Sequence, residues 1–212
     1  MSYLVLVRHG LSTYNKENVF TGQQDVPLAQ EGVEQARRAA HTLANTRFDH
    51  AFVSTLKRAH GTLEPIIQHT SVPITRTSAL DERSYGELEG MNKDKARKRF
   101  GEQQVFIWRR SYGVKPPGGE SLKDVYERAV PYFETHILPL VREGKNVLVV
   151  AHGNSLRAII KYIEDITDQD IPHLEIATGI PLVYVHEDDA FTSDNHTPSF
   201  TRPVHWHEFH RA

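Results

Sequence analysis

Two histidines of this sequence, His9 and His152, occur in the same local context and could act as nucleophiles. Residues 3–7 form an apolar run before the Arg-His-Gly tripeptide of His9, and residues 146–150 form another before the Ala-His-Gly tripeptide of His152. A neutral imidazole nitrogen is a capable nucleophile toward phosphorus near neutral pH and also leaves readily. The chain contains no cysteine, so thiol nucleophiles and thiolate-held zinc are excluded.

Arginines stand at the same predicted strand ends. Arg8 directly precedes His9, and Arg58 follows a further apolar run at residues 50–53. A transferring phosphoryl group carries charge on three equatorial oxygens, which planar guanidinium groups stabilise well. The sequence has no glycine-rich loop followed by lysine and serine or threonine, so it does not hold phosphate as a P-loop enzyme does. We therefore predict phosphoryl transfer in a pocket of histidines and arginines.

The apolar runs also predict the fold that positions these residues. Runs without polar alternation are typical of strands covered on both faces in a parallel sheet. Strands expected at 3–7, 50–53, 146–150 and 181–186 alternate with helices expected at 30–45, 121–142 and 154–165. This order favours an α/β fold, a three-layer sandwich with a mostly parallel central sheet flanked by helices. Because parallel strands end at one edge, His9 and His152 should meet in one cleft.

Polar residues with capping propensity predict where helices begin. Ser121 followed by Asp124 is typical of a capping box, and it should open a long helix that bends at its prolines. The pairs Ser54-Thr55 and Asn154-Ser155 should cap two further helices, the second of which would direct its amino end into the cleft. The helix at 30–45 should face the sheet with Val33, Ala36, Ala40 and Leu43.

Length and composition predict one main domain. The chain has 212 residues, 39% of them hydrophobic, and no low-complexity tract. We predict a single catalytic α/β domain over residues 1–186, with an excursion over the site at about 78–119, followed by a polar C-terminal tail at 187–212. In the tail, His205 and His207 could form a metal pair, but the sequence offers no further ligands beside them.

Charge and hydropathy favour a cytoplasmic protein. The formal net charge is −2 and no segment is uniformly basic, which argues against a nucleic-acid partner. No apolar stretch approaches the length of a membrane span. The apolar run at 3–7 has no basic leader and is too short for a signal peptide. We therefore expect neither a membrane partner nor secretion.

A series of short motifs extends this interpretation to a family. In chain order the motifs are Arg8-His9-Gly10, Phe20-Thr21-Gly22, Leu56-Lys57-Arg58-Ala59, Glu82-Arg83, Tyr85-Gly86, Gly90-Met91-Asn92-Lys93, Trp108-Arg109-Arg110 and Ala151-His152-Gly153-Asn154-Ser155-Leu156-Arg157. Over about residues 3–186 the chain resembles the cofactor-dependent phosphoglycerate mutases of the histidine phosphatase superfamily. The motifs that begin at Gly90 and Trp108 resemble the mutases in particular, and not the general phosphatases of the superfamily.

The resemblance implies a phosphoglycerate mutase-like fold and a mechanism without a metal. His9 would receive a phosphoryl group from 2,3-bisphosphoglycerate, the primer, and pass it between the 2- and 3-hydroxyls of a small phosphorylated glycerate. Glu82 would shuttle the proton of the accepting hydroxyl. The implied catalytic residues are His9, Glu82, His152, Arg8 and Arg58. The implied substrate-binding residues are Asn15, Thr21, Gly22, Tyr85, Lys93, Arg109, Arg110, Gly153 and Asn154.

The chain departs from the family pattern at several positions. It carries Leu11, Gln23, Asp81 and Ser84 where members usually have glutamate, tryptophan, asparagine, and histidine or tyrosine. None of these changes removes an implied catalytic group, but the first two alter the shape and charge of the substrate loop. The chain also lacks an insertion that longer members carry after Pro117. We expect a monomer or a small homo-oligomer.

Three functions remain open from the sequence. The first is the glycolytic mutase. The second is a phosphomonoester phosphatase of the same superfamily, in which water replaces the accepting hydroxyl. The third is a noncatalytic protein that binds a phosphorylated ligand, against which the joint presence of His9 and Glu82 argues, because a binding protein needs neither a nucleophile nor a proton shuttle.

Overall fold

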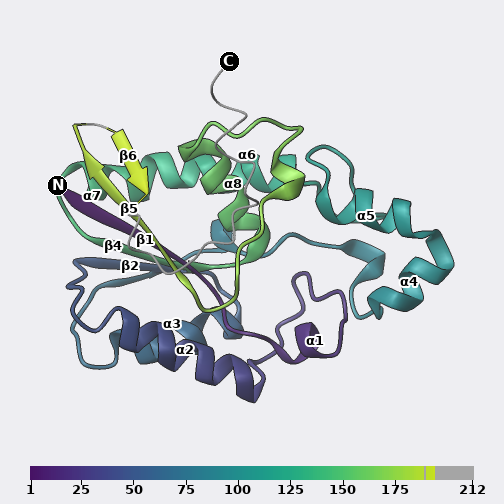
Figure 1. The fold of residues 1–212 in the computed structure, drawn as a ribbon, viewed down its shortest axis with the longest axis horizontal. Coiled ribbons are helices and arrows are strands. Elements are labelled where there is room, and N and C mark those ends of the chain that lie inside the picture. Colours follow the sequence, from purple (N-terminus) through teal and green to yellow (C-terminus); the bar gives the residue numbers. More distant parts are fainter. Residues whose placement is uncertain (189, 194–212) are drawn as a thin grey trace.

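The computed structural model describes residues 1–188 and 190–193, and its strands and helices alternate along the chain (Figure 1). The strands are β1 (Ser2–Arg8), β2 (His50–Val53), β3 (Ile74–Arg76), β4 (Val147–Ala151), β5 (Pro181–Glu187) and β6 (Ala190–Ser193). The α-helices are α1 (Thr13–Lys16), α2 (Gln30–Thr42), α3 (Lys57–Ile67), α4 (Lys93–Phe100), α5 (Glu102–Arg110), α6 (Leu122–Tyr132), α7 (Leu138–Arg142) and α8 (Gly153–Ile163). Short 3-10 helices are η1 (Ser78–Leu80), η2 (Gly86–Leu88) and η4 (Ile171–His173), and η3 (Phe133–Ile137) is a π-helical turn.

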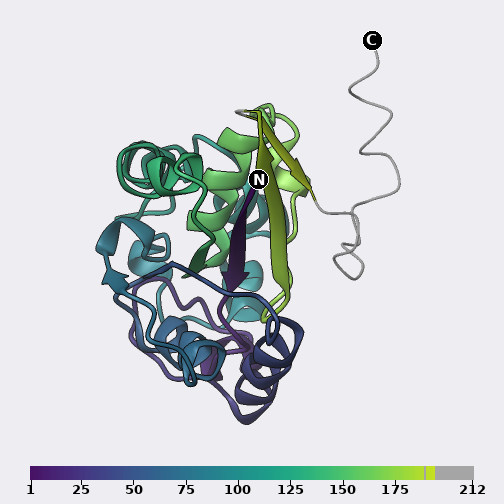
Figure 2. The same ribbon diagram turned by 90° about the vertical axis from the view of Figure 1, so that its left-hand side faces the viewer.

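The strands form one sheet in the order β3-β2-β4-β1-β5-β6. The pairs β3 with β2, β2 with β4, and β4 with β1 are parallel, whereas β5 runs antiparallel to β1 and β6 antiparallel to β5. Figure 2 shows β1 and β5 side by side. Arg8 at the end of β1 is opposite Ala151 at the end of β4, so the residues that follow these two strands emerge together.

Helices cover both faces of the sheet (Figure 1). On the face covered by α2 and α3, Val5 and Val7 of β1 pack with Leu63. On the face covered by α6, α7 and α8, Leu4 and Leu6 pack within a second core cluster. Successive side chains of a strand point to opposite faces, and burial of both faces explains why the run is apolar throughout. The predicted three-layer α/β fold with a mostly parallel sheet is confirmed.

Every predicted strand is present, and two short strands were missed. β1, β2, β4 and β5 match the runs at 3–7, 50–53, 146–150 and 181–186 to within about one residue. β3 has three residues at the edge of the sheet, and its Ile74 is 52% exposed, so it lacks the buried apolar run that marks the others. β6 lies in the segment predicted as a polar tail and is held by pairing with β5.

The capping box at the start of α6 is confirmed. Asp124 N–H donates to Ser121 Oγ at 3.1 Å, and Ser121 N–H donates to Asp124 Oδ2 at 2.7 Å. Pro131 lies inside α6, and the π-helical turn η3 follows directly before α7. The predicted long helix is therefore one continuous path of three helical segments, interrupted near its first proline.

Two predicted helix caps and part of one helix face are wrong. The N-cap of α3 is Leu56; Ser54 Oγ accepts from Leu56 N–H at 3.1 Å ahead of the helix and also contacts His152. The N-cap of α8 is His152 itself, two residues before the predicted start. In α2, Val33 is 38% exposed. The helix approaches the sheet through smaller residues instead, and its buried positions are Gly32, Ala36 and Ala39.

Residues 78–119 leave the sheet and include α4 and α5, which lie to one side of it in Figure 1. A small core of Phe20, Leu88, Ala96 and Val105 joins them to the loop after α1. Among the described residues, no helix combines the length and apolar character needed to cross a membrane. His205 and His207 lie outside the described residues, as does the tail from 194 onward.

Candidate active site

His9 and His152 lie side by side beyond the carboxyl ends of β1 and β4. Their ring centroids are 4.9 Å apart, and the ring planes are inclined by 56°. The parallel register is the cause, because it pairs the last residues of the two strands and so brings the next residues to the same edge. Both histidines are buried, with exposed fractions of 2% and 0%. The two histidines meet as their tripeptides predicted, but only His9 lines the cleft and His152 lies buried behind it.

Hydrogen bonding determines which nitrogen of His9 can attack. Nδ1 lies 2.6 Å from the carbonyl oxygen of Gly10. A carbonyl can only accept, so Nδ1 carries the ring proton and Nε2 keeps its lone pair. Burial lowers the pKa of His9 well below its ordinary value of 6.5, and the charges of Arg58 and Arg8 lower it further. His9 therefore has the neutral form that nucleophilic attack requires.

His152 is linked through a serine to a carboxylate. Its Nε2 lies 2.6 Å from Ser54 Oγ, and this hydroxyl lies 2.9 Å from Asp81 Oδ1. Because a carboxylate can only accept, Ser54 donates to Asp81 and accepts from His152 Nε2–H. Burial lowers the pKa of His152 well below 6.5, and the charge of Arg58 acts in the same direction. The sequence around Ser54 predicts a helix cap and gives no sign of its contact with His152.

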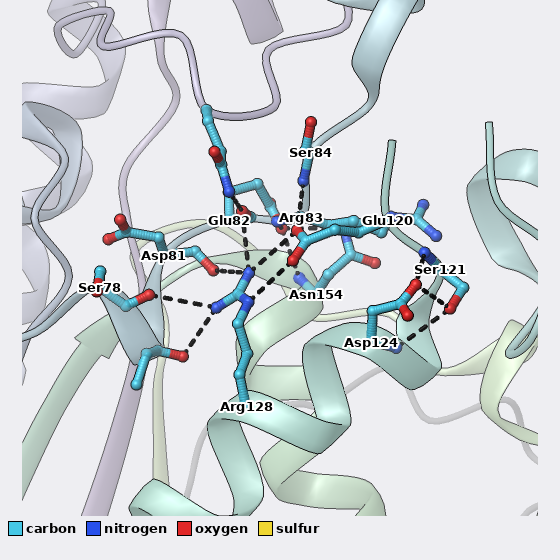
Figure 3. Close-up of polar contacts among 12 residues, drawn as sticks. Ser78, Asp81, Glu82, Arg83, Ser84, Glu120, Ser121, Asp124, Arg128 and Asn154 are labelled. Carbon is cyan, nitrogen blue, oxygen red and sulfur yellow. Dashed lines mark hydrogen bonds and ion pairs between the residues drawn. The ribbon is translucent and has the colours of Figure 1, made fainter. Parts of the chain in front are cut away.

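Glu82 reaches the cleft from the irregular segment between η1 and η2. Its Oε1 accepts from Arg83 N–H at 2.8 Å, from Asn154 N–H at 3.1 Å and from Asn154 Nδ2 at 3.0 Å (Figure 3). Burial raises the pKa of Glu82, but the Arg83 N–H bond and the charge of Arg58 outweigh burial and leave the pKa below 4.5. In the described part of the chain Oε2 accepts no hydrogen bond, so it is open to a substrate hydroxyl.

Arg8 and Arg58 supply positive charge beside the histidines. Arg58 donates through Nη1 to Gln24 O and through Nη2 to Gly22 O, both at 2.8 Å. Arg8 Nη1 donates to Ile176 O at 2.7 Å. These bonds to uncharged carbonyls fix the orientation of both guanidinium groups and leave their positive charge in place. In the described residues the Nε atoms of both arginines have no partner. The arrangement can accept the oxygens of a phosphoryl group.

The other predicted residues line the same cleft. Burial lowers the pKa of Lys93, and the charge of Arg109 lowers it further. Arg110 forms an ion pair with Glu175. His152 alone of the predicted set is not part of the lining and lies fully buried beside His9. The predicted residues in the lining are Arg8, His9, Asn15, Thr21, Gly22, Arg58, Glu82, Tyr85, Lys93, Arg109, Arg110, Gly153 and Asn154.

Part of the cleft wall consists of residues that were not predicted from the sequence. Arg157 lines the cleft, donates to Asn154 Oδ1 at 3.2 Å and to Ile171 O at 2.5 Å, and has a pKa that burial lowers to about 9. Its position one helical turn after Asn154 is a signal that could have found it. Residues 174–176 also line the cleft. They reach it on an irregular loop between η4 and β5, for which no sequence pattern exists.

Comparison with known proteins agrees with this geometry. Residues 4–196 match the family model of the Histidine phosphatase superfamily (branch 1). The chain belongs to this superfamily, as its motifs predicted.

Curated relatives narrow the similarity within the superfamily. The chain is 50% identical over 186 residues to the "2,3-bisphosphoglycerate-dependent phosphoglycerate mutase" of Beijerinckia indica, an alignment that covers 85% of this chain and 90% of the relative. It is 51% identical over 186 residues to the protein of the same name from Bradyrhizobium diazoefficiens, with the same coverage of both chains. The resemblance to the cofactor-dependent mutases is therefore confirmed.

Solved structures share the fold. "Mycobacterial hydrolase 1" matches with a TM-score of 0.83 at 23% identity, covering 94% of this chain and 100% of its own. "Bacillus stearothermophilus YhfR" matches with a TM-score of 0.80 at 25% identity, covering 91% of this chain and 95% of its own. At these identities the likeness concerns the arrangement of sheet and helices.

Proposed function

We propose that this chain interconverts 3-phosphoglycerate and 2-phosphoglycerate through a phosphohistidine at His9, primed by 2,3-bisphosphoglycerate. The chain is 50% and 51% identical in sequence to two proteins named 2,3-bisphosphoglycerate-dependent phosphoglycerate mutase, and this similarity supports the proposed reaction. The observation that carries the proposal is that Glu82, with an open Oε2, lines the same cleft as His9. A mutase must remove a proton from a hydroxyl and bind phosphorus in one pocket, and these two groups supply both functions.

Buried guanidinium groups support a polyanionic ligand such as the primer. In the described residues the Nε atoms of Arg8, Arg58 and Arg157 lack partners. The carboxylate of Glu82 compensates part of the charge of Arg58, but several cations share this one carboxylate, and their remaining charge is costly to bury unless a ligand compensates it. Two phosphates and a carboxylate fit this donor set, with Arg8 and Arg58 at the transferring phosphate. Tyr85, Lys93, Arg109 and Arg110 would hold the remaining charges. When bound, the primer supplies the phosphoryl group that loads His9.

In the first half of the cycle, Glu82 acts as the base. Its Oε2 takes the proton of the C2 hydroxyl of 3-phosphoglycerate while that oxygen bonds to the phosphorus on His9. The N–P bond breaks, and its electron pair returns to Nε2. Arg8 and Arg58 stabilise the charge on the equatorial oxygens, and the buried ring of His152 packs against the ring of His9. The lowered pKa of Glu82 keeps it ionised and ready for this step.

In the second half, Glu82 acts as the acid. His9 Nε2 bonds to the phosphorus at C3, the P–O bond breaks, and Glu82 returns its proton to the C3 oxygen. Between the two halves Glu82 carries the proton taken from the C2 hydroxyl, and it gives this proton up when the C3 oxygen leaves.

We further propose that the enzyme is cytoplasmic, that residues 1–186 form its catalytic domain, and that it is a monomer or a small homo-oligomer. No metal takes part in the steps above, and no nucleic acid or membrane is a partner. Size determination in solution decides the oligomeric state.

Mass spectrometry after incubation with 2,3-bisphosphoglycerate tests the function. The phosphoryl label should map to His9, and isomerisation of 3-phosphoglycerate should depend on the primer. His9→Asn should abolish both, whereas His41→Asn, on the exposed side of α2, should change neither. A label on another residue, or full turnover by His9→Asn, would contradict the proposal. Phosphate release that outpaces isomerisation and ignores the primer would instead identify a phosphomonoester phosphatase.

A further inference from the structure

Arg128 on α6 donates hydrogen bonds to backbone carbonyls of the segment that carries Glu82 (Figure 3). Its Nη1 donates to Ala79 O at 2.9 Å. Its Nη2 donates to Asp81 O at 2.9 Å and to Glu82 O at 3.2 Å. A longer contact of 3.4 Å joins Nη1 to Ser78 O. One guanidinium group therefore contacts four carbonyls of a stretch of five residues.

Glu120 completes this arrangement from the residue before the N-cap of α6. Its Oε1 accepts from Arg128 Nε at 3.1 Å, and its Oε2 accepts from Ser84 N–H at 2.8 Å. Arg128 and Glu120 thus hold the segment on both sides of Glu82 (Figure 3). Both side chains are 25% exposed, so they can be substituted without opening the core.

The segment depends on these partners because it belongs to neither a helix nor a strand. η1 ends at Leu80 and η2 begins at Gly86, and in the described residues the carbonyls of Asp81 and Glu82 between them accept no backbone N–H. A guanidinium group presents its N–H donors in one rigid plane, and this fixes the spacing of the carbonyls that it binds. Because Arg128 fixes the backbone at Glu82, it also fixes the position of the carboxylate. Oε1 accepts from Arg83 N–H, and this bond determines the direction of Oε2.

We propose that Arg128 is a positioning residue for proton transfer and that, together with Glu120, it holds the Glu82 carboxylate where it can exchange a proton with the substrate oxygen. This inference rests on the proposed function of Glu82. Arg128 is not part of the cleft lining, so it acts through the backbone of residues 79–82 and not by contact with substrate.

Substitution of Arg128 tests the inference. Arg128→Met removes the donors, and kcat for isomerisation should fall roughly 10- to 100-fold, as expected for a catalytic group displaced by about an ångström. KM should change little, because the binding residues stay in place. Arg128→Lys keeps three donors and should recover part of the loss. Arg37→Met removes an ion pair with Glu34 on the surface of α2 and should leave turnover unchanged.

A comparison of two substrates with different leaving groups distinguishes a displaced Glu82 from a general loss of structure. An alkyl phosphate needs a proton from Glu82 as its oxygen leaves, whereas p-nitrophenolate leaves without one. The burst of p-nitrophenolate from p-nitrophenyl phosphate should therefore change little in Arg128→Met and in Glu82→Gln. The carboxylate of Asp81 is held separately by Ser54 and Thr55, so the contacts of His152 should persist.

The pH profile of isomerisation gives a second readout. Looser Oε1 contacts would raise the pKa of Glu82, so the acid limb of kcat should move to higher pH in Arg128→Met. Arg8 of β1, Arg58 of α3, Tyr85 and Asn154 of α8 also face this carboxylate, and the substitution leaves them in place. The charge of Arg128 also lowers the pKa of His152, so a shift that appears equally in p-nitrophenolate release, which does not need Glu82, would belong to His152 and contradict the inference.

The possible outcomes distinguish the positioning role of Arg128 from the proton-transfer role of Glu82. Equal losses for phosphoglycerate and p-nitrophenyl phosphate, or wild-type kcat in Arg128→Met, would overturn the positioning role. Full isomerase activity in Glu82→Gln would instead overturn the proposed function of Glu82 itself. Loss in Glu82→Gln with no loss in Arg128→Met would reject the positioning role alone.

Discussion

His9 and Glu82 are both buried in one cleft, and the pKa of each is lowered. A lowered pKa leaves the histidine neutral and the glutamate ionised. Burial and two arginines disfavour the charged form of His9. Burial also disfavours the charged form of Glu82, but N–H donors and the same arginines compensate for it. At neutral pH the cleft therefore holds an uncharged nucleophile and an ionised proton acceptor, which is the pairing that transfer to a hydroxyl requires.

Loading of His9 should remain rapid below pH 6.5. The pKa of His9 is lowered, so the neutral ring persists as the pH falls through the ordinary value for histidine. Single-turnover release of p-nitrophenolate from p-nitrophenyl phosphate, followed from about pH 5 to 8, measures this step. We expect a flat rate through pH 6.5 and a decline only at more acidic pH. A midpoint at or above 6.5 would show that burial and the arginines do not depress the pKa.

Arg58→Met should lower kcat by roughly 10²- to 10³-fold, the usual cost of removing one preorganised charge-stabilising donor. Arg58 is 1% exposed and held by two carbonyls, so its charge is fixed in place before substrate binds. Steady-state isomerisation measures the effect, with urea unfolding to confirm that the variant is folded. Lys57→Met is the matched control, because the neighbouring side chain is 72% exposed and should not affect turnover. A loss below tenfold would rule out the assigned role.

At the scale of elements, the loop after β1 and the start of α2 meet through backbone. A Cβ on Gly10 would lie 2.4 Å from Gly32 O, and a Cβ on Gly32 would lie 2.1 Å from Leu11 O. Ala29 N–H donates to Leu11 O at 2.8 Å. The helix therefore supports the loop that carries His9, and glycine is required because no side chain fits between them.

Gly10→Ala should destabilise the protein by about 1–3 kcal/mol, the typical cost of overpacking. The clash is with backbone, which cannot rotate away, so either α2 or the His9 loop must shift. Urea unfolding measures the stability, and single-turnover loading of His9 measures the displacement. Gly113→Ala provides the comparison, because a Cβ there meets no atom within 4 Å. Equal stability of the two variants would show that the close approach carries no cost.

The sequence predicted elements well where burial on both faces leaves an uninterrupted apolar run, as in β1 and β4. It failed at β3 and β6, which are short and at or near the edges of the sheet, so burial imposes no such pattern on them. In the site, residues inside local motifs could be located. Ser54 and Arg128 could not, because their roles arise from contacts distant in sequence: Ser54 with His152 at the start of α8, and Arg128 with the irregular segment that carries Glu82.

At the scale of the whole molecule, charge is unevenly distributed. The chain has a formal net charge of −2, yet the cleft gathers guanidinium groups at depth. Arg58 and Arg157, which line the cleft, are at most 4% exposed, and in the described residues each retains a buried N–H group without a partner. Such groups oppose folding unless an anion compensates them. In the empty enzyme, the positive charge of the cleft is therefore only partly compensated by carboxylates of the protein.

A polyanion should therefore stabilise the fold measurably. Ligand at about 100 times its Kd adds roughly 2.7 kcal/mol, and for a chain of this size that corresponds to a rise in Tm of about 5–10 °C. Thermal unfolding with 2,3-bisphosphoglycerate should show the rise, and sodium chloride at equal ionic strength should not reproduce it, because simple salt screens charge without bridging the guanidinium groups. Arg58→Met should reduce the rise. A Tm that does not respond to the polyanion, or that responds equally to chloride, would mean that the buried arginines are compensated within the protein and do not form an anion site.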